Sequence, residues 1–153
     1  MATHSIYELY KTDSTLEKQG KPFLFADGNL RVTLARAGGG NQRYEKILTA
    51  NAKPYRRAIQ AELISPDKAQ EILMATYAEA IVQKWETLIT QDDGMGDFKE
   101  GILLEGMEGL QPVNIANIVK LFKTLPELFR EVQEEANKLS NYQTYEREED
   151  VKN

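Results

Sequence analysis

Residues that commonly carry catalysis or hold metal ions are scarce in this chain. Its 153 residues include one histidine, His4, and no cysteine. Without cysteine there is neither a disulfide framework nor a thiolate zinc site, and one histidine leaves hydrolytic triads and histidine zinc sites without their usual members. We expect His4 to be solvated in a polar N-terminal arm. The lack of cysteine fits a reducing, intracellular compartment.

Two loops resemble ligand sites only in part. Residues 38–41 read GGGN before an expected helix, but they lack the Gly-Lys-Ser/Thr ending of a phosphate loop and the βαβ setting of a dinucleotide site. We interpret them as a strand-to-helix turn. Residues 92–97 are acidic, but position twelve of a calcium loop there would be Leu103 or Leu104 instead of glutamate.

Carboxylate pairs give no better candidate for catalysis. Glu131 and Glu135 lie one helical turn apart, but the surrounding segment is so acidic that a solvated helix face explains them. We therefore nominate no catalytic, cofactor-binding or metal-ligating residue. The sequence predicts that the protein is not an enzyme.

Charge is unevenly distributed along the chain. The net charge is −5, yet residues 31–57 hold seven Lys or Arg residues and one acid, Glu45. The densest part is residues 53–57 (KPYRR), where cations could bind phosphates and Tyr55 could stack on bases. The overall negative charge opposes nucleic-acid binding at long range. We favour solvated helix faces, or contacts with the protein's own acidic C-terminal tail, over a nucleic-acid site.

The apolar pattern predicts an α+β fold that is predominantly helical, with about five helices and an N-terminal β-hairpin. The hairpin is expected at residues 23–35 around Asp27-Gly28, because apolar and polar residues alternate after a turn pair. Residues 1–20 form an N-terminal arm, residues 21–141 a single domain and residues 142–153 an acidic flexible tail. No apolar run is long enough to span a membrane, and no secretory leader is expected.

Five segments are expected to be helical. The longest starts at Ser65-Pro66, a good N-cap and first helical residue, and continues to Ile89 on an i, i+3, i+4 apolar stripe. Residues 102–104 are interpreted as one short strand. The other four helices are expected at residues 42–51, 55–63, 115–125 and from 126 onward.

Several short segments follow one another along the chain in a recognisable order. They are residues 9–13 (LYKTD), the hairpin 23–35, 35–41 (ARAGGGN), 53–57 (KPYRR), 85–86 (WE), 93–94 (DG) and 125–129 (LPELF). This ordered set resembles the tail assembly chaperones of long-tailed bacteriophages. One departure is the glycine-rich stretch 94–109, which is longer than expected for that family.

The resemblance implies a protein of the host cell cytoplasm that binds the phage tape measure protein, keeps it soluble and promotes assembly of tail tube protein around it. It implies neither an active site nor a cofactor. It also implies a longer isoform made by ribosomal frameshifting near the C-terminal residues 151–153 (VKN), if their codons form a slippery run. A homo-oligomer is a further expectation.

The candidate contact surface combines apolar residues of the last helix with cations of the basic segment. An amphipathic helix of the partner would dock against it, helix in groove. Two other classes remain open: a structural virion protein, such as a head–tail joining or tail terminator subunit, and a nucleic-acid-binding phage regulator. The candidate residues are Leu128, Phe129, Val132, Arg43, Lys53, Arg56 and Arg57.

Overall fold

A four-stranded antiparallel sheet forms the centre of the computed structural model, which describes residues 5–143. The strand order follows the chain, β1-β2-β3-β4, and every neighbouring pair is antiparallel. Such a meander needs only short connections except between β2 and β3, where the chain inserts helices. The strands are β1 (Lys21–Phe25), β2 (Leu30–Leu34), β3 (Val82–Thr90) and β4 (Gly96–Glu100).

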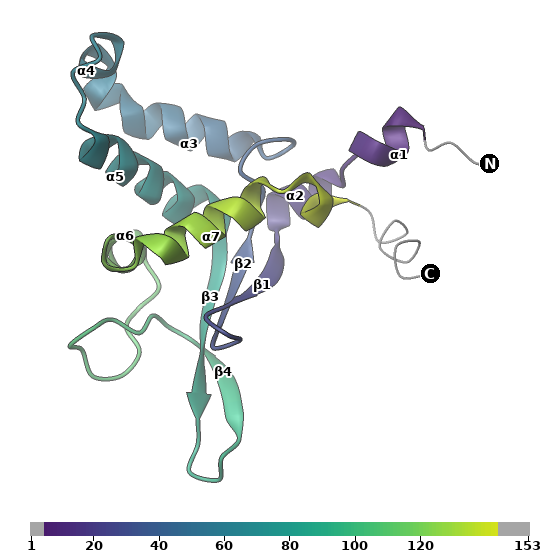
Figure 1. Cartoon of the computed structure of the whole chain (residues 1–153), viewed down its shortest axis with the longest axis vertical. Coiled ribbons are helices and arrows are strands. Elements are labelled where there is room, and N and C mark those ends of the chain that lie inside the picture. The colour runs from purple at the N-terminus through teal and green to yellow at the C-terminus, as the bar shows by residue number, and fades with distance from the viewer. Residues whose placement is uncertain (1–4, 144–153) are drawn as a thin grey trace.

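Helices precede the sheet, interrupt it and follow it. In Figure 1, α3 and α5 run side by side with α4 at their far end, α6 and α7 lie near the sheet, and the β3–β4 hairpin extends away from the helices. The helices are α1 (Ile6–Tyr10), α2 (Ser14–Gln19), α3 (Gln42–Ala52), α4 (Arg56–Gln60), α5 (Pro66–Thr76), α6 (Ile115–Thr124) and α7 (Pro126–Asn137), with the 3₁₀ turns η1 (Lys53–Tyr55) and η3 (Leu139–Tyr142) and the π-helical turn η2 (Tyr77–Ile81).

Several predicted boundaries follow from local chemistry. The β1–β2 hairpin forms as expected, because Asp27 and Gly28 adopt positive φ in its turn. The Oγ atom of Ser65 accepts the Lys68 N–H at 3.1 Å, and Pro66 starts α5. Pro126 likewise separates α6 from α7. In contrast, the side chain of Asn41 does not cap α3 but donates to the Arg36 carbonyl at 2.8 Å.

The predicted fold is wrong in its balance of helix and sheet, although the α+β class fits. The hairpin is not the first element, since α1 and α2 precede it, and it is half of a four-stranded sheet. The expected long helix stops at η2, and residues 82–90 form β3. Residues 102–104 make only an isolated bridge, between Ile102 and Gln111. Residues 82–90 form a strand because they pair with β2. This pairing extends the β1–β2 hairpin, and a two-stranded hairpin alone is only marginally stable.

One hydrophobic core joins the sheet to the helices. Val32 of β2 and Trp85 of β3 are fully buried, and the Trp85 ring lies 5.9 Å from that of Phe122 on α6. Tyr142 is also fully buried, and its hydroxyl donates to the Leu34 carbonyl at 3.0 Å. The packed part of the chain therefore reaches Gln143, while residues 144–153 of the expected acidic tail, and His4, lie outside the described residues.

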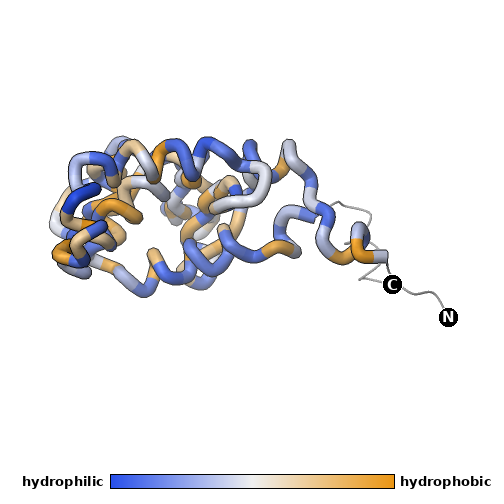
Figure 2. The backbone as a smooth tube through the Cα atoms, turned by 90° about the horizontal axis from the view of Figure 1, so that it is seen from above, coloured by the Kyte–Doolittle hydropathy of each residue, from blue (hydrophilic) through white to orange (hydrophobic). Residues whose placement is uncertain are grey.

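The short helix α1 stands apart from this core. Figure 2, which views the molecule from above, shows it projecting at one end of the chain's path, and all of its residues are exposed. A hydrogen bond from Gln143 Nε2 to the Leu9 carbonyl, 2.8 Å long, ties it to the end of η3. No helix among residues 5–143 has both the length and the apolar character needed to cross a membrane.

Candidate partner-binding grooves

The apolar half of the expected contact surface belongs to the core. Phe129 and Val132 have no exposed area, and Leu128 keeps 9%. The Phe129 ring contacts Tyr77 edge-on at 5.3 Å and lies 4.7 Å from Phe122. These three residues of α7 cannot touch a partner without unfolding, so their assignment as a contact surface is wrong. The amphipathic pattern of α7 was correct, but it is the protein's own sheet and helices that cover its apolar face.

All four residues of the basic half are exposed, and Arg43 is already hydrogen-bonded within the fold. Arg43 Nη1 donates to the Glu79 carbonyl in η2 at 2.8 Å, so it fastens α3 to the turn that precedes β3. Lys53 and Arg56 line a groove between α3 and α4. Arg57 is exposed beside this groove but does not line it. We refer to this surface as the basic groove.

Tyr55, which a nucleic-acid site would use for stacking, already has a cation on its face. Lys68 Nζ lies 5.0 Å from the centre of its ring. The aromatic face is therefore partly used by α5, and this weakens the interpretation of residues 53–57 as a base-stacking platform.

The glycine-rich turn at residues 38–40 binds a carboxylate of the protein itself. Glu17 of α2 is 2% exposed, and its carboxylate accepts hydrogen bonds from Arg36 Nη1 at 2.6 Å and from Thr12 Oγ1 at 2.8 Å. Burial acts to raise the pKa of Glu17, but hydrogen bonds from Arg36, the Gly40 N–H and Thr12, with the positive charge of Arg36, outweigh it and leave the pKa below its ordinary value. The turn is thus a strand-to-helix connection with a structural role.

The acidic loop at residues 92–97 closes the β3–β4 hairpin. Asp93 Oδ1 accepts the Met95 N–H at 2.9 Å, and Gly94 adopts a φ of 82°, as turn residues do. Across residues 5–143, groups of three or more Asp, Glu or His side chains placed to hold a metal ion do not occur.

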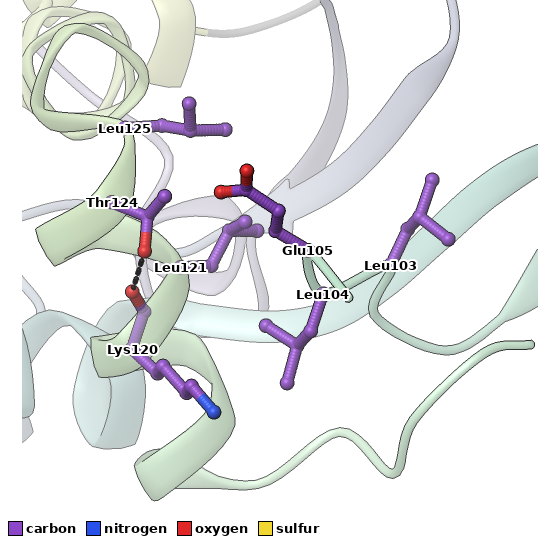
Figure 3. Close-up of a pocket in the computed structure, with 7 residues that line it drawn as sticks. All are labelled: Leu103, Leu104, Glu105, Lys120, Leu121, Thr124 and Leu125. Carbon is purple, nitrogen blue, oxygen red and sulfur yellow. Dashed lines mark hydrogen bonds between the residues drawn. The ribbon is translucent and has the colours of Figure 1, made fainter. Parts of the chain in front are cut away.

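An apolar surface groove lies between the loop after β4 and helix α6 (Figure 3). Asn114 caps α6 by accepting the Asn117 N–H at 2.8 Å, and the Ile102–Gln111 bridge closes the loop against the sheet. The groove holds about 650 Å³, within the usual range of ligand sites. We call it the leucine groove; its lining residues are Leu103, Leu104, Glu105, Lys120, Leu121, Thr124 and Leu125.

The leucine groove combines a buried floor with exposed apolar walls. Leu104 and Leu121 are 5% and 8% exposed, whereas Leu103 and Leu125 are 56% and 48% exposed. Figure 3 shows Leu103 and Leu125 on opposite sides, with the Glu105 carboxylate between them. Half-exposed leucines facing a hollow lose water when an apolar side chain enters, at roughly 25 cal/mol per Å² buried. The groove is thus suited to binding apolar side chains.

Sequence reasoning missed the leucine groove. The sequence predicts a short strand at residues 102–104 and places Leu125 at the end of the helix expected at residues 115–125, and neither prediction indicates a groove. Only the fold brings residues 103–105 against residues 120–125, which follow fifteen or more residues later in the chain. A signal was present, because Leu103 and Leu104 are adjacent and in an extended segment must face opposite ways.

The fold and grooves define an antiparallel α+β protein whose described surface offers binding grooves. The sequence model of the YdaY prophage protein family matches residues 39–153, three quarters of the chain, and the protein belongs to this family. The match includes both grooves. Comparison with curated proteins and with solved structures found no match. The chain is thus phage-derived, which agrees with the bacteriophage origin implied by the sequence resemblance. The family match does not extend to a role in tail assembly.

Proposed function

We propose that this protein is a tail assembly chaperone that acts in the host cytoplasm and holds an amphipathic helix of the phage tape measure protein in the leucine groove. The observation that carries the proposal is the pair of half-exposed leucines, Leu103 and Leu125, on the two walls of an apolar hollow. The prophage family and the resemblance of residues 9–129 to such chaperones support it. The role is one of binding and not of catalysis.

The groove matches what such a client needs to have covered. A long helical protein that has not yet assembled exposes apolar stripes, and these aggregate. Apolar residues at i, i+3, i+4 and i+7 of a client helix would enter the groove along α6. Burying two or three such side chains contributes about 3–9 kcal/mol before the entropy of association is subtracted. This range suits a complex that forms and later dissociates.

Two charged residues belong to the lining of the leucine groove. Lys120 and Glu105 line it and are exposed. Such charged groups keep a complex hydrated and fix the orientation of the client more than they add affinity. Release of the client to the tail tube protein then requires no covalent step.

Co-expression with the tape measure protein of the same prophage tests the proposal. The wild-type chain should raise the soluble fraction of the tape measure protein several-fold and co-purify with it. The double variant Leu103→Asp/Leu125→Asp should abolish both effects. A matched control, Leu24→Asp/Met95→Asp, changes two residues that are 62% and 68% exposed outside the groove and should retain them. Equal loss in both variants, or no gain with the wild type, would refute the proposal.

Mass spectrometry of purified virions separates a chaperone from a structural virion protein. A chaperone leaves after assembly and should be absent from mature particles. A head–tail joining or tail terminator subunit should be present in ring stoichiometry, and its detection would replace the proposal.

A further inference from the structure

We propose that the basic groove is a second docking site, separate from the leucine groove, and that it binds an apolar helical segment flanked by acidic residues. The groove holds about 670 Å³ between α3 and α4. Its lining residues are Leu48, Thr49, Ala52, Lys53, Arg56, Ile59 and Gln60.

The helices that form this groove are unusually open. None of the residues of α3, η1 or α4 is buried. The inner face of α3 is held by contacts with the middle of the chain: the Tyr44 ring lies 5.7 Å from that of Tyr77, and Asn51 Nδ2 donates to Thr76 Oγ1 at 3.1 Å. Leu48 and Ala52, which are half-buried, lie beside this inner face and line the groove together with Ile59 of α4. This flank of α3 is the part that a partner could contact.

The floor of the basic groove is apolar. Leu48 and Ala52 come from α3, and Ile59, which is 41% exposed, comes from α4. Exposed apolar residues gathered in a hollow with a polar rim are typical of protein-binding sites. A partner must therefore supply apolar side chains as well as charge.

The cations on the rim have no carboxylate partner. Some cations of the described surface are ion-paired: Lys84 lies 3.6 Å from Glu86, and Lys123 lies 3.4 Å from Glu71. Lys53 and Arg56 have no carboxylate oxygen within 4.0 Å among residues 5–143. Acidic residues next to the partner's apolar stripe would complement the charge of these two cations, which lie beside the apolar floor.

A nucleic acid fits this surface less well than an acidic helix. Phosphates would satisfy Lys53 and Arg56, but the floor of Leu48, Ala52 and Ile59 offers bases no aromatic platform. Tyr55 already lies against Lys68. In Figure 1, α3 and α4 lie on the other side of α5 from α6, and the two grooves have no lining residue in common, so both can be occupied at once.

Fluorescence anisotropy with three labelled probes tests the inference on the full chain. The probes are an amphipathic helical peptide of about 18 residues with a leucine stripe flanked by glutamates, the same stripe flanked by lysines, and a single-stranded DNA of equal negative charge. The glutamate peptide should bind at least about tenfold more tightly than the lysine peptide at low salt. Raising the salt to about 0.3 M should weaken it several-fold, because the Debye length then shortens.

Two pairs of variants locate the binding. Lys53→Glu/Arg56→Glu should weaken the glutamate peptide about tenfold and improve the lysine peptide, whereas Lys11→Glu/Lys99→Glu reverses two exposed cations elsewhere and should change neither. Ile59→Asp should weaken the glutamate peptide about tenfold, whereas Leu63→Asp, at a residue that is 80% exposed and does not line the groove, should not. Circular dichroism verifies that each variant is folded.

Each contrary result overturns the inference. Equal binding of the glutamate and lysine peptides, or no effect of Lys53→Glu/Arg56→Glu, would show that the groove does not select acidic helices. DNA that binds as tightly as the glutamate peptide and ignores Ile59→Asp would identify a general polyanion surface. Because Leu103→Asp/Leu125→Asp leaves the basic groove intact, failure here is distinguishable from failure of the chaperone proposal.

Discussion

Glu17 and Arg36 form a buried ion pair that fastens the N-terminal helix α2 to the chain leaving β2. Arg36 Nη1 lies 2.6 Å from Glu17 Oε2, and the two side chains are 18% and 2% exposed. The Arg36 N–H also donates to the Glu17 carbonyl at 2.8 Å. The same two residues thus join through both backbone and side chain, and the turn at residues 38–40 wraps around them.

Glu17→Gln should lower the free energy of unfolding by about 3 kcal/mol, because Arg36 loses its charge partner in a largely buried site. Urea unfolding followed by circular dichroism measures the change. Glu100→Gln, at an exposed residue of β4, serves as the control and should change the free energy by less than about 0.5 kcal/mol. Equal effects of the two substitutions would contradict a structural role for the pair.

Acid should destabilise the protein through the same carboxylate. The pKa of Glu17 is lower in the folded state than its ordinary value of 4.5, so its stabilisation is complete above pH 4.5 and is lost as the pH falls further. Glu86, whose pKa is lowered first by the Arg31 hydrogen bonds, contributes in the same direction. The free energy of unfolding of the wild type should therefore exceed that of Glu17→Gln at pH 7, and the difference should shrink as the pH is lowered to 3. Urea unfolding at a series of pH values measures it. A constant difference at every pH would argue against this linkage.

Gly39→Ala should be more damaging than Gly28→Ala, although both residues have positive φ. At Gly28 a methyl group meets nothing within 4 Å, so only the left-handed backbone is penalised, by about 1 kcal/mol. At Gly39 it would collide with the side chains of Glu17 and Arg36 and disrupt the ion pair, for a total of at least about 3 kcal/mol. Thermal or urea unfolding measures the loss of stability in each variant. Equal losses in Gly39→Ala and Gly28→Ala would contradict the close approach of Glu17 and Arg36 to Gly39.

Phe129→Ala should destabilise the protein by about 3–5 kcal/mol, since it opens a cavity between Tyr77 and Phe122. Leu125→Ala, at a residue that is 48% exposed, should cost less than about 1 kcal/mol and should weaken client binding instead. Unfolding free energies together with the co-purification assay distinguish the two roles. A stable Phe129→Ala variant that lost its client would restore α7 as the contact surface.

Local sequence signals predicted those parts of the fold that depend on neighbouring residues. The turn at Asp27-Gly28, the cap at Ser65 and the break at Pro126 were predicted because they rest on backbone preferences within a few residues. The helix predicted at Trp85 is wrong because Val82, Trp85 and Leu88 recur at the spacing of three that is typical of a helix, and only pairing with β2 makes the segment a strand. Its register, Val32 opposite Trp85, pairs residues far apart in the sequence.

The candidate sites show the same division. Lys53 and Arg56 could be nominated from charge alone, since a cluster of cations is visible in one short segment. The leucine groove could not, because Leu103 and Leu125 meet only when the loop after β4 folds onto α6.

By itself the sequence determined the turn between β1 and β2, the start of α5, the break at Pro126, the amphipathic faces and the lack of thiol chemistry. The tertiary structure decided which amphipathic face is core and which is surface: it sealed Phe129 and Val132 inside and left Leu103, Leu125 and Ile59 exposed. The physical reason is that burial depends on what an apolar stripe packs against, and that partner comes from distant parts of the chain.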